Sequence, residues 1–297
     1  MLCAAGLAAC SRSDPSVTST SAYPQGSPVA RQSATPPPAV TSVLDRSPTP
    51  DLVATAQAGF PAETLTSQVS PDGLWWARVF SHPCPEQANG EAYGYDYLQI
   101  GDQRSGEQSI LFSQLIACGG TGAGGLEGRF WAPTSRYYYF TDAARGAPGG
   151  CGYWRPPLLR LDVTDWSITL LGAGTFSPDG FQFAAWLEDE LVIWDLSTGL
   201  IASAAPPVAG ALPGPIAWSP DEQAIAYLLS ESNCPRGLTY LVRMELADLH
   251  ATPYLASQDP SFAEIQWLTP NSVTLTDENG QNWAYNFITG ELAHGTP

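Results

Sequence analysis

Four cysteines in the body of the chain have the chemistry to form covalent cross-links. They are Cys84, Cys118, Cys151 and Cys234. An even number of cysteines in a chain expected to be exported indicates two disulfides. Three pairings exist, and we prefer Cys118 with either Cys84 or Cys151, because those loops belong to the same or to adjacent repeats. Close pairs such as Cys-x-x-Cys are missing, so no metal site is expected at these cysteines. No cofactor is predicted for the chain.

Acidic loop residues are the second group that could carry chemistry. Five of them are expected on one surface of the fold: Glu86, Glu91, Glu188, Asp189 and Glu231. Two carboxylates across a central funnel would act as acid and as nucleophile or base in glycoside hydrolysis. Binding of Ca²⁺ is the other chemistry that such carboxylates offer. The chain has 29 acidic residues, however, so several must fall in loops by composition alone. A carbohydrate-active enzyme is therefore the alternative function, and no catalytic residue is assigned.

Aromatic loop residues suggest a binding surface instead of a catalytic one. Tyr93, Tyr95, Tyr153 and Trp154 lie in or beside long predicted loops. Exposed aromatic rings are enriched where proteins bind partners. Together with Glu188 and Asp189 they define a candidate binding rim. Packing of the long loops over the fold would explain the same rings.

Other chemical motifs are weak or missing. The run 119–128 contains a formal G-x-G-x-x-G, but a strand follows it, and a dinucleotide site needs a helix there. No G-x-S-x-G nucleophile elbow occurs. The three histidines, His82, His250 and His294, are far apart in the sequence, and His82 is expected in a solvated loop.

The N-terminus carries a short motif that suggests a cellular address. Leu7-Ala8-Ala9-Cys10 resembles a bacterial lipobox, in which the cysteine becomes the lipidated N-terminus. The resemblance implies a truncated signal leader over residues 1–9, lipidation of Cys10, and a location in the cell envelope outside the cytoplasm. The apolar run before Cys10 is short, and no basic residue precedes it.

Residues 10–50 are expected to form a tether between this anchor and a folded domain. From Ser11 to Pro50 the sequence is rich in Ser, Thr and Pro and has few residues to bury. Such a segment cannot offset the entropy of ordering, so it is predicted to stay extended. The folded domain is then assigned to residues 51–297.

The folded domain is built from repeats. A short apolar strand ends in a Ser-Pro-Asp-Gly type of turn at Ser70, Ser177 and Ser219, with weaker copies at Ala132 and Thr269. The residues Val69, Phe130, Phe176, Trp218 and Trp267 mark the repeats, at steps of 61, 46, 42 and 49 residues. Alternating strands follow each turn, so the sequence predicts an all-β fold with a period near that of a propeller blade.

These repeats resemble the TolB-type and WD-repeat β-propellers. The Ser-Pro-Asp-Gly copies are similar to the TolB-type repeat, and residues 191–199 are similar to a WD strand with its Thr-Gly turn. The resemblance implies about five four-stranded blades, with six as the alternative. The last repeat lacks an outer strand, so we expect a segment between Asp51 and Thr66 to complete it. A β-sandwich is the competing fold.

Composition narrows the classes of partner. The net charge is −17, and all 12 basic residues are Arg. Such a surface repels phosphate backbones, so nucleic acid is not an expected partner. We expect a monomeric, membrane-anchored propeller that acts as a binding or scaffold module for protein or glycan rather than as an enzyme.

Overall fold

Strands make up the regular structure of the protein. The computed structural model describes residues 62–84, 93–118, 125–143, 147–148, 154–231 and 237–295, which contain 21 strands and no α-helix. No helix in these ranges is long and apolar enough to cross a membrane.

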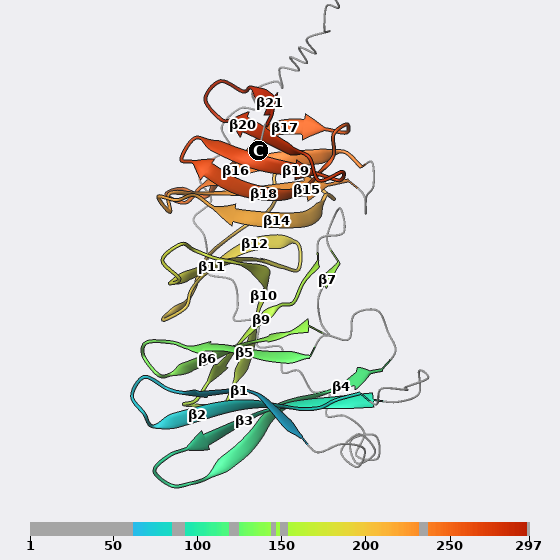
Figure 1. Ribbon diagram of the computed structural model, residues 1–297. Coiled ribbons are helices and arrows are strands. Elements are labelled where there is room, and N and C mark those ends of the chain that lie inside the picture. Colours follow the sequence, from blue (N-terminus) through green and yellow to red (C-terminus); the bar gives the residue numbers. More distant parts are fainter. Residues whose placement is uncertain are drawn as a thin grey trace, which may run out of the picture. The chain divides into compact units, whose positions relative to one another are not determined.

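The strands form five antiparallel four-stranded units, which we call blades 1 to 5 in chain order (Figure 1). Blade 1 contains β1 (Glu63–Val69), β2 (Trp75–His82), β3 (Tyr93–Asp102) and β4 (Gln108–Ala117). Blade 2 contains β5 (Leu126–Trp131), β6 (Tyr137–Asp142), β9 (Leu158–Asp162) and the first part of β10 (Ile168–Phe176). Blade 3 contains the rest of β10, β11 (Gln182–Leu187), β12 (Glu190–Asp195) and β13 (Gly199–Ala204).

The C-terminal units follow the same order. Blade 4 contains β14 (Leu212–Trp218), β15 (Ala224–Ser230), β16 (Thr239–Glu245) and β17 (His250–Ser257). Blade 5 contains β18 (Phe262–Thr269), β19 (Ser272–Asp277), β20 (Asn282–Asn286) and β21 (Leu292–His294). A small ladder of β7 (Ala147–Pro148) and β8 (Trp154–Arg155) lies between β6 and β9 in the chain. Consecutive four-stranded meanders are the architecture of a β-propeller, so the predicted fold class is confirmed.

Strand β10 belongs to two blades. Its first residues pair with β9 and its last residues pair with β11, so blades 2 and 3 join in one seven-stranded sheet. The change occurs at Gly172, which has a φ of +103°. A side chain there would place Cβ 2.3 Å from the carbonyl oxygen of Trp186, so the strand can switch partners here only with glycine.

The predicted closure of the last blade by an N-terminal segment is wrong. The described part of that segment, Glu63–Thr66, lies in β1 and pairs with β2 of blade 1. Blade 5 obtains its fourth strand from its own chain, because Leu292–His294 turns back on β20 after a tight turn at Gly290. Three residues are enough for a short edge strand, which the sequence pattern did not reveal. Residues 51–61 lie outside the described residues.

The Ser-Pro-Asp turns connect the first two strands of a blade and are held by the side chains that define the motif. In blade 1 the Ser70 hydroxyl donates to the Asp72 carboxylate at 2.6 Å, and the Leu74 N–H donates to the same carboxylate at 3.0 Å. These bonds hold the pKa of Asp72 below its usual range, with the Ser70 bond the largest cause. The same Ser–Asp bond recurs at Ser177 and Ser219.

The last position of the turn has a positive φ in blades 1 to 4. Gly73 and Gly180 occupy it in blades 1 and 3, whereas Ser135 (φ +60°) and Glu222 (φ +57°) occupy it in blades 2 and 4. Each of these two side chains accepts a hydrogen bond from the preceding blade: Ser135 from the Asp72 N–H at 3.0 Å and Glu222 from the Asp179 N–H at 2.8 Å. The departures from glycine therefore connect neighbouring blades.

Apolar faces of adjacent blades form the core. One cluster joins Val79 and Leu98 of blade 1 to Tyr138 and Leu159 of blade 2, and all four side chains are fully buried. The Trp residues that mark the repeats add specific contacts, since Trp218 Nε1 donates to Thr175 O at 3.1 Å and Trp267 Nε1 to Ala217 O at 2.9 Å. Burial of such side chains contributes about 2–3 kcal/mol each.

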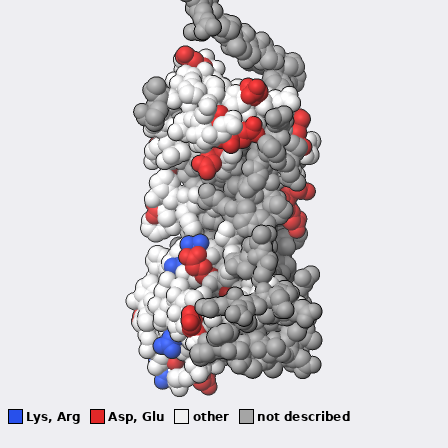
Figure 2. Space-filling view, turned by 45° about the vertical axis from the view of Figure 1, so that its right-hand side comes forward, with Lys and Arg blue, Asp and Glu red and all other residues white. Residues whose placement is uncertain are grey.

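Charged side chains are unevenly distributed. Most described arginines lie in blades 1 and 2, and they are Arg78, Arg104, Arg129, Arg136 and Arg160. On the face seen in Figure 2, blue side chains lie in the region of the N-terminal blades, and only red ones are seen over the C-terminal blades.

Candidate functional site

The cysteine-bearing edge of blade 1 is held by a disulfide. Cys84 follows β2 and Cys118 follows β4, and their sulfurs are bonded, with the Cα atoms 5.6 Å apart. The end of β2 thus lies beside the end of β4, as expected from strand alternation. Cys118 pairs with Cys84, one of the two partners we preferred. Cys151 and Cys234 lie outside the described residues, as does Cys10.

The aromatic residues of the predicted rim do not form one exposed platform. Tyr93 is 36% exposed, but Tyr95 is only 6% exposed and packs against His82 and Tyr97. Tyr153 lies outside the described residues, and only the backbone of Trp154 is described, in β8. Tyr95 therefore serves packing and offers little surface to a ligand.

His82 is also buried, which corrects the expectation of a solvated loop residue. It ends β2 with 8% of its surface exposed, and its ring lies about 6 Å from those of Tyr95 and Tyr97. Asp96, 1% exposed on the neighbouring strand, accepts a hydrogen bond from the Leu126 N–H of blade 2 at 2.9 Å. Burial raises the pKa of Asp96, against the opposing effects of Ser81, Leu126 and His82.

The loop carboxylates proposed for the alternative enzyme are not gathered by the described part of the structure. Glu188 and Asp189 form the exposed two-residue turn between β11 and β12, and Glu231 accepts a hydrogen bond from the Tyr240 hydroxyl. Glu86 and Glu91 lie outside the described residues. Within the described ranges, no group of three or more His, Cys, Asp or Glu could hold a metal ion.

Asp189 instead borders a shallow hollow of about 370 Å³. Its floor and walls are Trp186, Leu229, the connection from β13 to β14 and the start of β14; the connection contributes Ala205, Pro206, Ala209, Gly210 and Ala211, and β14 contributes Leu212 and Pro213. The indole N–H of Trp186 is already bonded to Gly214 O at 2.8 Å. Since nearly all of its lining is aliphatic, this hollow offers few groups that would orient a polar ligand.

A second hollow, of about 330 Å³, has a different lining and lies at the opposite end of blade 1 from the disulfide. Its walls are Trp75, Ile100, Asp102, Glu107, Gln108, Ser109, Leu111 and Trp166. We call it the Trp75–Trp166 hollow. It lies where the turn between β3 and β4 of blade 1 meets the turn between β9 and β10 of blade 2. Its volume is at the lower end of the ~300–1,000 Å³ typical of small-molecule sites.

Two indoles form the aromatic part of this hollow. The rings of Trp75 and Trp166 meet edge to face, with centroids 5.5 Å apart and an interplanar angle of 84°. Trp75 is half-buried and packs on the core between blades 1 and 2, whereas Trp166 is 43% exposed. One ring is therefore anchored in the fold, and the other is presented to solvent beside it.

The backbone of Trp166 is unusual for so large a residue. Its φ is +64°, and the equivalent turn position is Gly106 in blade 1, Gly199 in blade 3 and Gly290 in blade 5. Only blade 4 also has a side chain there, Leu249 at φ +57°. A left-handed non-glycine residue costs about 1–2 kcal/mol. Such strain persists where the surroundings hold it in place, often at functional sites.

Asp162 holds the turn that presents Trp166. Its backbone carbonyl accepts the Trp166 N–H at 2.8 Å, and its carboxylate accepts two hydrogen bonds from Arg136, at 2.9 and 2.6 Å. Burial favours a higher pKa, but the bonds from Arg136 and Thr164 outweigh it, so the pKa of Asp162 is lowered. The turn is thus fixed by an ionised, 6% exposed carboxylate beneath it.

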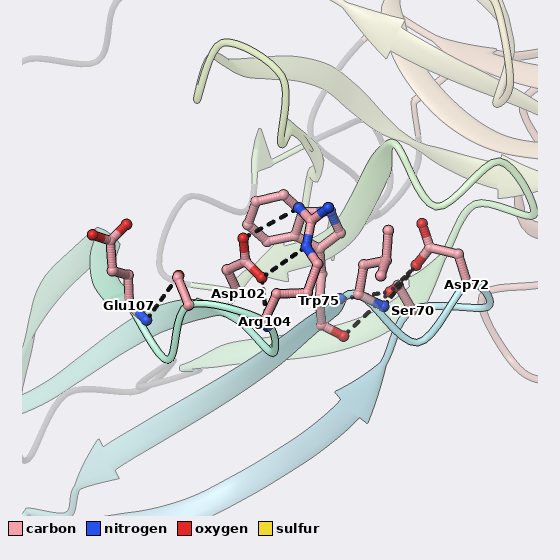
Figure 3. Close-up of polar contacts among 8 residues, drawn as sticks. Ser70, Asp72, Trp75, Asp102, Arg104 and Glu107 are labelled. Carbon is pink, nitrogen blue, oxygen red and sulfur yellow. Dashed lines mark hydrogen bonds and ion pairs between the residues drawn. The ribbon is translucent and has the colours of Figure 1, made fainter.

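Two carboxylates face the hollow in different electrostatic states. Figure 3 shows Asp102 bonded to Arg104, which donates to it from Nε at 3.3 Å and from Nη2 at 3.2 Å. These contacts hold the pKa of Asp102 below its usual range, with the Arg104 side chain as the largest cause. Glu107 is exposed and has no ion-pair partner among the described residues.

The hydrogen-bonding groups of the hollow are available to a ligand. Within the part of the chain that is described, no acceptor bonds the indole N–H of Trp75 or Trp166, in contrast to Trp186 and Trp218, whose N–H groups bond backbone carbonyls. Gln108 and Ser109 add an exposed amide and hydroxyl. The hollow therefore combines an apolar aromatic corner with unpaired donors and acceptors.

Sequence reasoning did not identify this site. The sequence pattern places Trp75 only in a strand, and it marks none of Asp102, Glu107 and Trp166. A signal for Trp166 was nevertheless present, because comparison of the third-to-fourth-strand turns shows a Trp where three other repeats have Gly. The partnership with Trp75 could not be predicted, since it depends on how blades 1 and 2 pack.

Comparison with known proteins supplies no functional assignment. No family model matches the chain, and no curated protein matches it. Similar solved structures include an oligogalacturonate lyase in complex with manganese, at 13% identity over 72% of this chain and 60% of that one, with a TM-score of 0.40. TolB from Acinetobacter baumannii is 14% identical over 77% of this chain and 53% of that one, with a TM-score of 0.31.

A eukaryotic initiation factor is similar at 15% identity over 80% of this chain and 55% of that one, with a TM-score of 0.39. The chain thus spans between 53% and 60% of the length of these three structures. Likenesses of this strength carry no argument about activity or ligand. The propeller fold rests on the strand pairing described above.

Proposed function

We propose that this chain is an extracytoplasmic β-propeller that binds carbohydrate in the Trp75–Trp166 hollow. The observation that carries the proposal is Trp166, a large ring held half-exposed against Trp75 in a backbone conformation that three of the four other blades reserve for glycine. An exposed, strained tryptophan that contributes little to the core has a better explanation in ligand contact than in folding.

The chemistry of the hollow favours carbohydrate over a protein surface. A sugar ring has apolar C–H faces that pack on an indole, and hydroxyls that bond to carboxylate, amide and indole N–H groups. The hollow supplies each of these within about 330 Å³. A protein interface would need a much larger contiguous area, about 800 Å² for each partner.

Replacing Trp166 with Gly tests the proposal. Glycine accepts the left-handed backbone, so the variant should fold as stably as the natural chain while losing the aromatic wall. We expect at least about a tenfold loss of affinity for bound oligosaccharides, as for other aromatic contact residues. Binding is measured by calorimetry, after a panel of neutral and charged oligosaccharides has identified ligands.

Leu249→Gly is the control, because Leu249 occupies the same strained turn position in blade 4, where it packs on the core between blades 3 and 4 and does not line the hollow. It should leave carbohydrate affinity unchanged. The proposal fails if no oligosaccharide binds the natural chain, or if both variants bind as the natural chain does. Capture of an envelope protein that depends on Trp166, without any carbohydrate binding, would instead favour a protein ligand.

The location is part of the proposal. The lipobox-like Leu7–Cys10, the Ser/Thr/Pro-rich residues 10–50 and the disulfide between Cys84 and Cys118 all support a lipid-anchored protein in an oxidising compartment. The natural chain should fractionate with membranes, and Cys10→Ser should release it. Release is read by immunoblotting of membrane and soluble fractions, and equal fractionation of both forms would argue against the anchor.

A further inference from the structure

The charge balance of the Trp75–Trp166 hollow identifies a feature of its ligand. Asp102 is neutralised by Arg104, whereas Glu107, five residues later and directly before β4, has no ion-pair partner among the described residues. In Figure 3, dashed lines join the Asp102 carboxylate to Arg104, and none reaches the Glu107 carboxylate, which stands apart from them. No basic side chain lines the hollow.

One unpaired carboxylate beside two indoles is suited to a cation. An ammonium group bonds a carboxylate with charge assistance, and it is also attracted to the face of a tryptophan within about 6 Å. An anionic sugar would meet repulsion from Glu107 and from a chain of net charge −17. The hollow therefore selects against uronates and phosphorylated sugars.

We infer that the ligand of the Trp75–Trp166 hollow is an amino sugar with a free ammonium group, which Glu107 binds while the ring packs on the indoles. The inference rests on the proposed carbohydrate-binding function and adds the chemical class of the sugar. Glu107 is a specificity residue in this assignment, and Trp75 and Trp166 supply contact area that any sugar ring would share.

The experiment compares ligands of similar size and different charge on the full chain. Glucosamine trisaccharide, its N-acetylated form and galacturonate trisaccharide are titrated by calorimetry at pH 6, where the free amines are protonated. We expect the free amine to bind about fivefold or more tighter than the acetamide, the gain of one partly exposed charge pair. Galacturonate should bind weakest. Added salt should narrow these differences.

Glu107→Gln should lower the affinity for the glucosamine trisaccharide to that for its N-acetylated form. The affinity for the N-acetylated form should stay unchanged. Glu291→Gln is the matched control, because Glu291 follows Gly290 in blade 5 as Glu107 follows Gly106 in blade 1. Spermidine, a cation without a sugar ring, tests for binding by charge alone.

The outcomes separate this inference from the proposed function. If the acetamide or galacturonate binds as well as the free amine, the inference is overturned and carbohydrate binding stands. The same holds if Glu107→Gln leaves the affinity for the free amine unchanged. If spermidine binds as tightly as the glucosamine trisaccharide, and Trp166→Gly leaves the affinity for the trisaccharide unchanged, charge alone explains the binding and the inference is overturned. If no sugar binds, both proposals fail.

Discussion

Buried Asp96 and exposed Asp72 show how single carboxylates respond to their place in a blade. Asp96 lies in the interior between blades 1 and 2, where burial raises its pKa. Asp72 lies in a surface turn, where hydrogen bonds from Ser70 and Leu74 lower its pKa. The two residues have the same side chain and opposite shifts, so they should affect stability oppositely as pH changes.

We predict that Asp96→Asn becomes more stabilising, relative to the natural chain, as pH rises from 4 to 7. A raised folded-state pKa means that the unfolded chain releases the Asp96 proton first, so the natural chain loses stability over that range. Asn does not titrate. The melting temperature is measured at each pH for both proteins.

Asp72→Asn is the control with the opposite sign. Its lowered pKa contributes stability that is present above the ordinary pKa of aspartate and is lost as pH falls. The melting temperature of this variant should therefore fall furthest below that of the natural chain at neutral pH. Parallel pH profiles for the two variants would contradict the assigned environments.

Turns between strands are the elements that connect the blades. Ser135 keeps a left-handed backbone and is 4% exposed, and its hydroxyl accepts the Asp72 N–H of the preceding blade. Gly73, at the equivalent position of blade 1, makes no such contact because it has no side chain. The cost of a non-glycine residue at this position is thus compensated by a bond between elements.

We predict that Ser135→Ala lowers the free energy of unfolding by about 1–2 kcal/mol, because the Asp72 N–H loses its acceptor while the left-handed strain remains. Ser135→Gly loses the same bond but relieves about 1 kcal/mol of backbone strain, so its free energy of unfolding should be closer to that of the natural chain. Urea unfolding measures both. An alanine variant as stable as the natural chain would show that the bond contributes nothing.

At the scale of the whole molecule, the last blade completes itself. β21 pairs with β20 through Leu292 and His294, and the His294 ring lies 4.9 Å from that of Trp283. Without this strand, β20 would become an exposed edge with unpaired backbone groups, which favours association between chains.

Ending the chain at Gly290 should therefore lower stability by about 2–3 kcal/mol, from three lost strand residues and the partly buried Leu292. It should also promote oligomers, detected by size-exclusion chromatography. A chain ending at Gly295 keeps β21 and serves as the control. Equal stability and a monomeric profile for both truncations would mean that another segment covers β20.

The sequence by itself predicted the repeat, about five blades and most of their strands, although it did not predict β21. Ser-Pro-Asp turns and alternating apolar residues are local signals, because each arises from the conformational preferences of a few consecutive residues. The same signals placed Cys84 and Cys118 on one edge of blade 1, where they are bonded.

Contacts between blades could not be predicted from these local signals. Whether Tyr95 and His82 face solvent or the interior depends on which blade packs on them, and the fourth strand of blade 5 is too short to show a pattern. The meeting of Trp75 with Trp166 joins residues 91 positions apart, across the seam between two sheets. Packing of apolar faces brings such residues together, and its geometry is a property of the assembled fold.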